Sequence, residues 1–133
     1  MPNIDVSKLV PLIGPAHVEA EQRRRLAAGF DFDFHDVRGV HHIATTEKDM
    51  QDWQEVTSWA NARTARGDKV STITIATASG FAEITALEWW SIVDAGTAAR
   101  QPIFQGAFWL LAQDPVPPDY ATNDAYWGKH PPK

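Results

Sequence analysis

The chain has 133 residues, 44% of them hydrophobic and 22% charged, a balance typical of one globular domain with a single core. It contains no cysteine, which excludes disulfide frameworks, thiolate zinc sites and cysteine nucleophiles, and is compatible with folding in a reducing cytoplasm. The net charge of -5 argues against a general nucleic-acid-binding protein, and no apolar run approaches the roughly 20 residues that span a membrane. Because the start of the chain also lacks a signal-peptide pattern, we expect a soluble protein without membrane or nucleic-acid partners.

Residues 1–15 are predicted to form an extended N-terminal arm. Pro2, Pro11 and Pro15 each remove an amide donor and push the preceding residue out of helical geometry. The segment is too apolar for a solvated tail, so we expect it to pack on its own domain or on a partner. Its candidate interface residues are Leu9, Leu12 and Ile13.

Residues 16–28 are predicted to form a short helix that ends before Gly29, a residue suited to a left-handed helix terminus. Three consecutive arginines, at positions 23 to 25, lie in this helix. Since Glu19 and Glu21 flank them, we interpret the run as a solvated, partly ion-paired face rather than a nucleic-acid contact.

A β-hairpin is predicted next. Phenylalanines alternate with aspartates and a histidine over residues 30–35, the period of a half-buried strand. A tight turn at 36–39 leads to a returning strand at 40–44. If His35 pairs with Val40, the register places Phe32 opposite Ile43 and Asp33 opposite His42.

The hairpin carries residue types that bind first-row metals. They are His35, His41 and His42, with Asp31, Asp33 and Asp36. Because neighbouring residues on a strand point to opposite faces, His41 and His42 cannot both join His35 on one side. We therefore predict a cross-strand pair of Asp33 and His42, with no metal or other cofactor.

The second half of the domain is predicted to repeat the order of hairpin and helix. Thr46 and Asp49 form an imperfect capping box that opens a helix ending near Gly67. Strands at 70–77 and 81–84 then form a second hairpin with a turn at 78–80.

The final helix is predicted to begin with the complete capping box of Thr85 and Glu88 and to continue to residue 112. Pro102 removes a backbone hydrogen bond and clashes with the carbonyl of Ala98, so we expect a kink or a break there.

Residues 113–133 contain five prolines and are predicted to form an extended tail. Tyr120, Tyr126 and Trp127 are aromatic residues of the kind that dock onto a neighbouring surface. The alternative is a polar tail in which these aromatics have no such role.

Tryptophans occur on both long predicted helices. Adjacent helical residues differ by about 100°, so one of Trp89 and Trp90 should enter the core while the other lies nearer the surface. We take Trp59 and Trp89 as interface candidates, with a sugar-stacking platform as the alternative. No phosphate-binding loop, dinucleotide fingerprint, zinc-protease motif or Gly-x-Ser-x-Gly context is present, so we expect no enzyme.

These observations give an α+β domain at 16–112, between the arm and the tail. Its expected order after the short helix is β-β-α-β-β-α.

The order of short motifs resembles a small uncharacterised domain of bacteriophage tail-fibre and tail-assembly proteins. The motifs are RRRLAAGFDF at 23–32, a hairpin ending at 42–43, DMQDW at 49–53 and ITALEWW at 84–90. The resemblance covers about residues 20–112 and transfers no active-site residues. The sequence departs from the family pattern at Pro102 and in its aromatic tail.

The resemblance implies a phage or prophage tail gene. Our first hypothesis is a virion structural protein of the tail, in the fibre or baseplate region, made in the host bacterial cytoplasm. It would bind other tail proteins through residues 1–15, exposed tryptophans and the C-terminal aromatics, with homo-oligomerisation left open. The second is a fibre-assembly chaperone that leaves before the virion is complete, and the third is a glycan hydrolase, supported only by the tryptophans.

Overall fold

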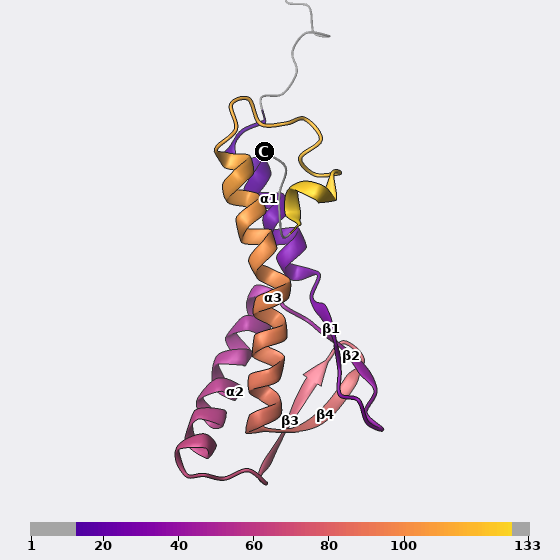
Figure 1. Cartoon of the computed structure of the whole chain (residues 1–133), viewed down its shortest axis with the longest axis vertical. Helices are drawn as coiled ribbons and strands as arrows, with labels where there is room; N and C mark the ends of the chain where they lie inside the picture. The colour runs from indigo at the N-terminus through magenta and orange to yellow at the C-terminus, as the bar shows by residue number, and fades with distance from the viewer. Residues whose placement is uncertain (1–12, 129–133) are drawn as a thin grey trace, which may run out of the picture.

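The computed structural model describes residues 13–128, and within them it contains three α-helices and two antiparallel sheets of two strands each (Figure 1). The predicted α+β class is confirmed. The elements in chain order are α1 (Pro15–Ala27), β1 (Phe30–Asp33), β2 (Val40–Ile43), α2 (Glu47–Ala65), β3 (Thr72–Thr77), β4 (Gly80–Thr85), α3 (Ala86–Leu111) and the 3-10 helix η2 (Asp124–Trp127). Most of the predicted arm, including Leu9 and Leu12, lies outside the described residues.

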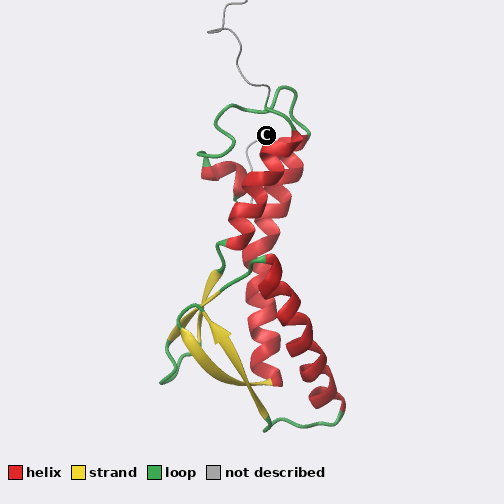
Figure 2. Cartoon of the chain, turned by 180° about the vertical axis from the view of Figure 1, so that it is seen from behind, coloured by secondary structure: helices red, strands yellow, loops and turns green. Residues whose placement is uncertain are grey.

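The molecule is elongated, and α3 runs along most of its length. Figure 2 shows α2 and the two hairpins on either side of the N-terminal half of α3, while α1 and η2 lie along its C-terminal half. Among residues 13–128, no helix is long and apolar enough to cross a membrane.

Local chemistry at two helix starts agrees with the prediction. At α2, the Thr46 hydroxyl accepts from the Asp49 amide at 3.2 Å, and the Asp49 carboxylate accepts from the Thr46 amide at 3.0 Å. Thr85 and Glu88 make the same reciprocal pair at the start of α3, at 3.2 and 3.0 Å. Each box satisfies amide groups that the first helical turn leaves unpaired, so both helices begin where the sequence predicts.

The larger core, which we call the hairpin cluster, joins both hairpins to α2 and the start of α3. Its buried members are Ile43, Ala60, Ile75, Ala82, Ile84, Ala86, Trp89 and Ile92. Trp89 is only 1% exposed, and its indole N–H donates to the Thr57 hydroxyl at 3.0 Å. Trp53 packs edge-on against Trp89, with ring centroids 5.0 Å apart.

A second core, the tail cluster, lies at the other end of α3. It consists of Val18, Ala107, Leu110 and Trp127. The prediction of an extended tail is therefore wrong for residues 113–128, because Trp127 turns back and is buried at 5% exposure. The turn is stabilised locally, since the Trp127 indole N–H donates to the Tyr120 carbonyl at 2.8 Å.

Of the kink or break expected at Pro102, the break is wrong, since α3 continues through it from Ala86 to Leu111. Proline forfeits one helical hydrogen bond. In this helix, buried residues lie on both sides of it, with Ile92 in the hairpin cluster and Ala107 in the tail cluster. Tertiary packing of this kind supplies most helical stability in proteins and offsets the local cost.

The register of the first hairpin differs from the prediction by two residues. Asp31, rather than Asp33, lies opposite His42, and Asp33 lies opposite Val40. A shift of two preserves the face of every side chain. The cause is a longer connection, in which the Phe34 amide donates to the Gly39 carbonyl at 3.0 Å and His35 adopts a positive φ of 59°.

Candidate functional site

Two histidines of the first hairpin, His41 and His42, have partners that stabilise its structure. The His42 ring lies between two acceptors, with Nδ1 2.8 Å from an Asp31 carboxylate oxygen and Nε2 2.7 Å from the Ala28 carbonyl. Both ring nitrogens must donate to satisfy these contacts, so the pKa of His42 is raised, first by Asp31 and then by Ala28. His41 is buried and its Nδ1 lies 2.7 Å from the Thr77 hydroxyl. Within residues 13–128, no three His, Asp or Glu side chains are grouped to hold a metal ion.

The hairpin loop is fastened to α3 through Arg38. Its guanidinium pairs with Asp36 at 2.5 Å and with Glu88, donates to the Glu83 carbonyl at 2.8 Å, and lies 4.2 Å from the centre of the Phe34 ring. The Arg38 hydrogen bond is the main cause that lowers the pKa of the Glu88 carboxyl. This polar network joins the two hairpins and leaves Arg38 committed to structure.

Two of the three consecutive arginines, Arg24 and Arg25, also form ion pairs within the chain. The Glu21 carboxylate, in a residue only 8% exposed, accepts from Arg24 Nε at 2.8 Å and from Arg25 Nε at 2.9 Å. The Arg24 hydrogen bond is the main cause that lowers the pKa of Glu21. Arg25 also pairs with Asp124 at 2.9 Å and lies 5.0 Å above the Trp127 ring. The expected ion-paired face is therefore partly an anchor for the tail.

The interface candidates predicted on the helices do not form one surface. Trp89 is buried, which corrects its assignment as an exposed interface residue: its face of α3 points into the hairpin cluster. Trp59 is half-buried and packs against the same cluster. Ile13 is partly buried just before α1.

The candidates in the tail lie together, but against their own domain. Tyr126 stacks on Trp109 of α3 with ring centroids 5.2 Å apart, and its hydroxyl donates to Asp119 at 2.9 Å. Tyr120 packs beside the tail cluster that contains Trp127. The three aromatics do dock onto a surface, and that surface belongs to α1 and α3 of the same chain.

Several exposed apolar side chains were missed by the sequence reasoning. They are Val37, Val40, Val70, Phe81, Leu87 and Phe108. Phe81 is 79% exposed. Strand alternation offered a signal for it, because Phe81 shares a face with Glu83 while Ala82 and Ile84 point to the core.

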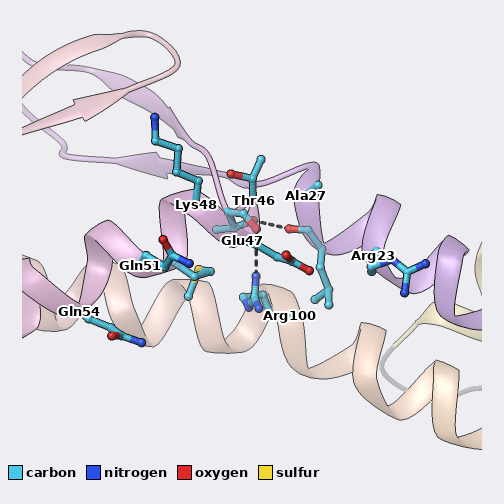
Figure 3. A pocket seen from close by; sticks show the side chains of 11 residues that line it. Arg23, Ala27, Thr46, Glu47, Lys48, Gln51, Gln54 and Arg100 are labelled. Atoms are coloured by element: carbon cyan, nitrogen blue, oxygen red, sulfur yellow. Dashed lines mark hydrogen bonds between the residues drawn. The ribbon is translucent and has the colours of Figure 1, made fainter.

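A hollow of about 600 Å³ opens where α1 ends, α2 begins and the middle of α3 passes both (Figure 3). Its apolar part is formed by Leu26, Ala27 and Met50. Its polar lining residues are Arg23, Thr45, Thr46, Glu47, Lys48, Gln51, Gln54 and Arg100. The wall is braced by the Thr45 hydroxyl, which donates to the Leu26 carbonyl at 2.5 Å.

Positive charge dominates this hollow although the whole chain is acidic. One cation comes from each helix, Arg23, Lys48 and Arg100, against the single carboxylate of Glu47. Arg100 donates to the Thr45 carbonyl at 3.3 Å. Burial lowers the pKa of Arg100, and no carboxylate among residues 13–128 lies within ion-pairing distance of it.

Comparison with known protein families, curated proteins and solved structures finds no match to this chain.

Proposed function

We propose that this chain is a non-enzymatic structural protein of a bacteriophage tail, in the fibre or baseplate region, that binds other tail proteins. The phage-tail source of the proposal rests on the order of short motifs, which resembles the tail-fibre and tail-assembly domain. The binding of other tail proteins is inferred from the apolar side chains exposed on the surface of residues 13–128. The carrying observation is that Phe81, Leu87 and Phe108 are 79%, 72% and 76% exposed.

Large apolar side chains this exposed are typical of protein interfaces when they gather at particular places. Leu87 lies in the first turn of α3, and Val70, 85% exposed, lies just before β3. Figure 1 shows the start of β3 and the start of α3 at the same end of the molecule, and Phe108 belongs to the opposite end of α3. An elongated subunit with apolar side chains at both ends suits contacts with two neighbours.

A binding role also agrees with how the polar groups are used. His42, Glu21 and Arg38 each have short partners that stabilise the fold. The interface proposed here therefore uses the exposed apolar side chains, in place of the tryptophans and tail aromatics that the sequence favoured. Nucleic acid and membrane are not proposed as partners.

The second candidate is an assembly chaperone that holds a fibre segment and leaves before the particle is complete. The net charge of -5 favours it, because charge repulsion keeps a carrier protein soluble while it shields an apolar client. The same exposed side chains would serve either role. Retention in the finished particle separates the two.

The test is peptide mass spectrometry on purified, salt-washed particles of the phage that encodes the chain, with copies counted per particle. A fixed copy number supports the structural role. Presence in the infected lysate bound to fibre protein, without presence in particles, favours the chaperone. Absence from both particles and fibre complexes contradicts both.

A matched pair of variants connects that test to the surface. Leu87→Ser removes an exposed apolar side chain at one end, and Val37→Ser removes one from the hairpin loop. If the end of the molecule is the interface, particles lose the first variant and retain the second while both remain folded. Equal retention of the two would contradict this placement.

A further inference from the structure

We propose that the hollow between α1, α2 and α3 binds an acidic peptide segment of a partner protein, with Arg100 pairing a carboxylate and the apolar wall taking a neighbouring apolar side chain. The inference rests on the proposed function, since the partner is another protein of the same assembly. It adds the chemistry that the partner must present.

Arg100 is the anchor of this site. A guanidinium carries five N–H donors in a planar fork, and the described structure uses one nitrogen, Nη1, for the Thr45 carbonyl. Phe104 lies beneath it, with the guanidinium carbon 5.8 Å from the ring centre. The Arg100 guanidinium is half-buried and has no counter-ion among residues 13–128, so a carboxylate arriving from outside could pair with it through two parallel hydrogen bonds.

The remaining charges favour an anion of some length. Figure 3 shows Arg23 and Lys48 pointing outward at opposite sides of the opening, with Arg100 between them. Glu47 lines the hollow, but it forms no ion pair with a cation among residues 13–128. A segment with one carboxylate at Arg100 and further acidic residues near the rim therefore meets complementary charge on both sides.

The size and lining of the hollow suit a short peptide segment. Its volume of about 600 Å³ falls within the range of roughly 300–1,000 Å³ that ordinary ligand pockets occupy. Leu26 and Ala27 form a fixed apolar side, and Met50 is an unbranched side chain that adapts to different apolar shapes. Nucleic acid fits less well, because phosphate backbones require an extended basic track and the chain carries a net charge of -5.

The experiment is a selection of random peptides, displayed on yeast, against the full-length folded chain. Enriched peptides are then synthesised and their affinities measured by fluorescence anisotropy. We expect them to contain aspartate or glutamate beside a large apolar residue. Replacing the acidic residue by its amide is expected to weaken binding at least about tenfold, since a charge-assisted bond contributes roughly 1.5–3 kcal/mol.

Variants of the chain locate the binding. Arg100→Gln is expected to weaken binding about tenfold or more, and Arg100→Lys less, because it keeps the charge but loses the planar fork. Lys48→Glu reverses an exposed charge at the rim and is expected to weaken binding without altering the fold. Lys69→Glu is the control, because it makes the same charge change at an exposed position outside the hollow.

Several results would overturn the inference: enriched peptides without acidic residues, no enrichment at all, equal weakening by the two lysine variants, or displacement of the peptide by oligothymidylate. The particle measurement tests the proposed function independently of peptide binding. If the chain is present in particles at a fixed copy number but its peptide binding is unchanged by Arg100→Gln, only the peptide-binding inference is wrong. If acidic peptides bind in a manner that depends on Arg100 but the chain is missing from particles and fibre complexes, the binding site is supported and the phage-tail assignment is wrong.

Discussion

Gly29 connects α1 to the first hairpin at a point where no other residue fits. Its φ is +76°, and an added Cβ would lie 2.3 Å from the Ile43 carbonyl oxygen. Gly39 has a similar φ of +69° but open space around it. We expect Gly39→Ala to lower the free energy of unfolding by about 1–2 kcal/mol, the backbone cost alone.

Gly29→Ala should cost about 1–3 kcal/mol more, because the neighbouring strand must also move. Urea unfolding of the two variants measures the difference. Equal losses would mean that the contact with Ile43 relaxes without cost.

His42 is predicted to make stability depend on pH. Its pKa in the folded chain is raised above the ordinary value of 6.5, so its contribution is complete below pH 6.5 and is lost as the pH rises through the raised pKa. Because the pair with Asp31 is largely exposed, the effect should be about 0.2–1 kcal/mol.

The measurement is the urea midpoint as a function of pH for the natural chain and for His42→Gln. Stability of the natural chain should decline more than that of the variant as the pH rises above 6.5. Parallel curves would show that the ring is not charged in the folded state.

Residue-level features were predictable where their causes are local. The capping boxes of Thr46 and Thr85 depend on residues three positions away, so the sequence contains all the information they need. The hairpin register was missed by two residues because the connection is longer than the turn expected at 36–39: it closes between Phe34 and Gly39, and His35 adopts a positive φ that strand alternation does not predict.

Among the elements, the C-terminal segment changes most between sequence and structure. An added Cβ at Gly106 of α3 would lie 2.4 Å from the Tyr126 carbonyl oxygen and 2.9 Å from the Trp127 Cα. Alanine is favoured over glycine inside a helix by about 1 kcal/mol, so Gly106→Ala should preserve α3 while pushing the segment away from it.

The readout for Gly106→Ala is the indole N–H resonance of Trp127, which donates to Tyr120 in the folded chain. We expect this resonance to shift toward its position in free tryptophan, while Gln105→Ala, at an exposed neighbouring position, leaves it unchanged. An unshifted resonance in Gly106→Ala would contradict the close packing.

Proline content explains why this segment was misjudged. A run of prolines disfavours regular helix and sheet, and the prediction wrongly took this to mean that the segment would not pack on the domain. An irregular segment can still bury a side chain when a facing helix offers small residues, as Gly106 and Ala107 do for Trp127. The unbroken α3 has the same origin, since packing at both ends outweighs the local cost of Pro102.

At the scale of the whole molecule, the two clusters should respond differently to truncation. If residues 113–133 formed the extended tail expected from the sequence, removing residues 114–133 would leave the core folded. The structure indicates instead that the tail cluster loses Trp127, whose deletion from a core costs about 3–5 kcal/mol. Hydrogen exchange of the truncated chain should show lost protection in α1 and retained protection in β3 and β4. Full protection of α1 would contradict the role of the tail in that core.

The hollow around Arg100 could not have been predicted from the sequence. Its lining comes from the end of α1, the start of α2 and the middle of α3. The lining residues are therefore far apart in the sequence, the most distant being Arg23 and Arg100. Local patterns predict elements and their faces, but the angle at which three helices meet depends on the packing of every residue between them.

The position of α3 has a mechanical consequence. Among the described elements, only α3 contributes buried side chains to both clusters. A pulling force applied between the hairpins and the tail segment is therefore shared by two parallel links: the stretch of α3 around Pro102, where one backbone hydrogen bond is missing, and the chain at Gly29 that joins α1 to the first hairpin. Under tension, we expect these two links to lengthen together, while each cluster remains intact at its own end.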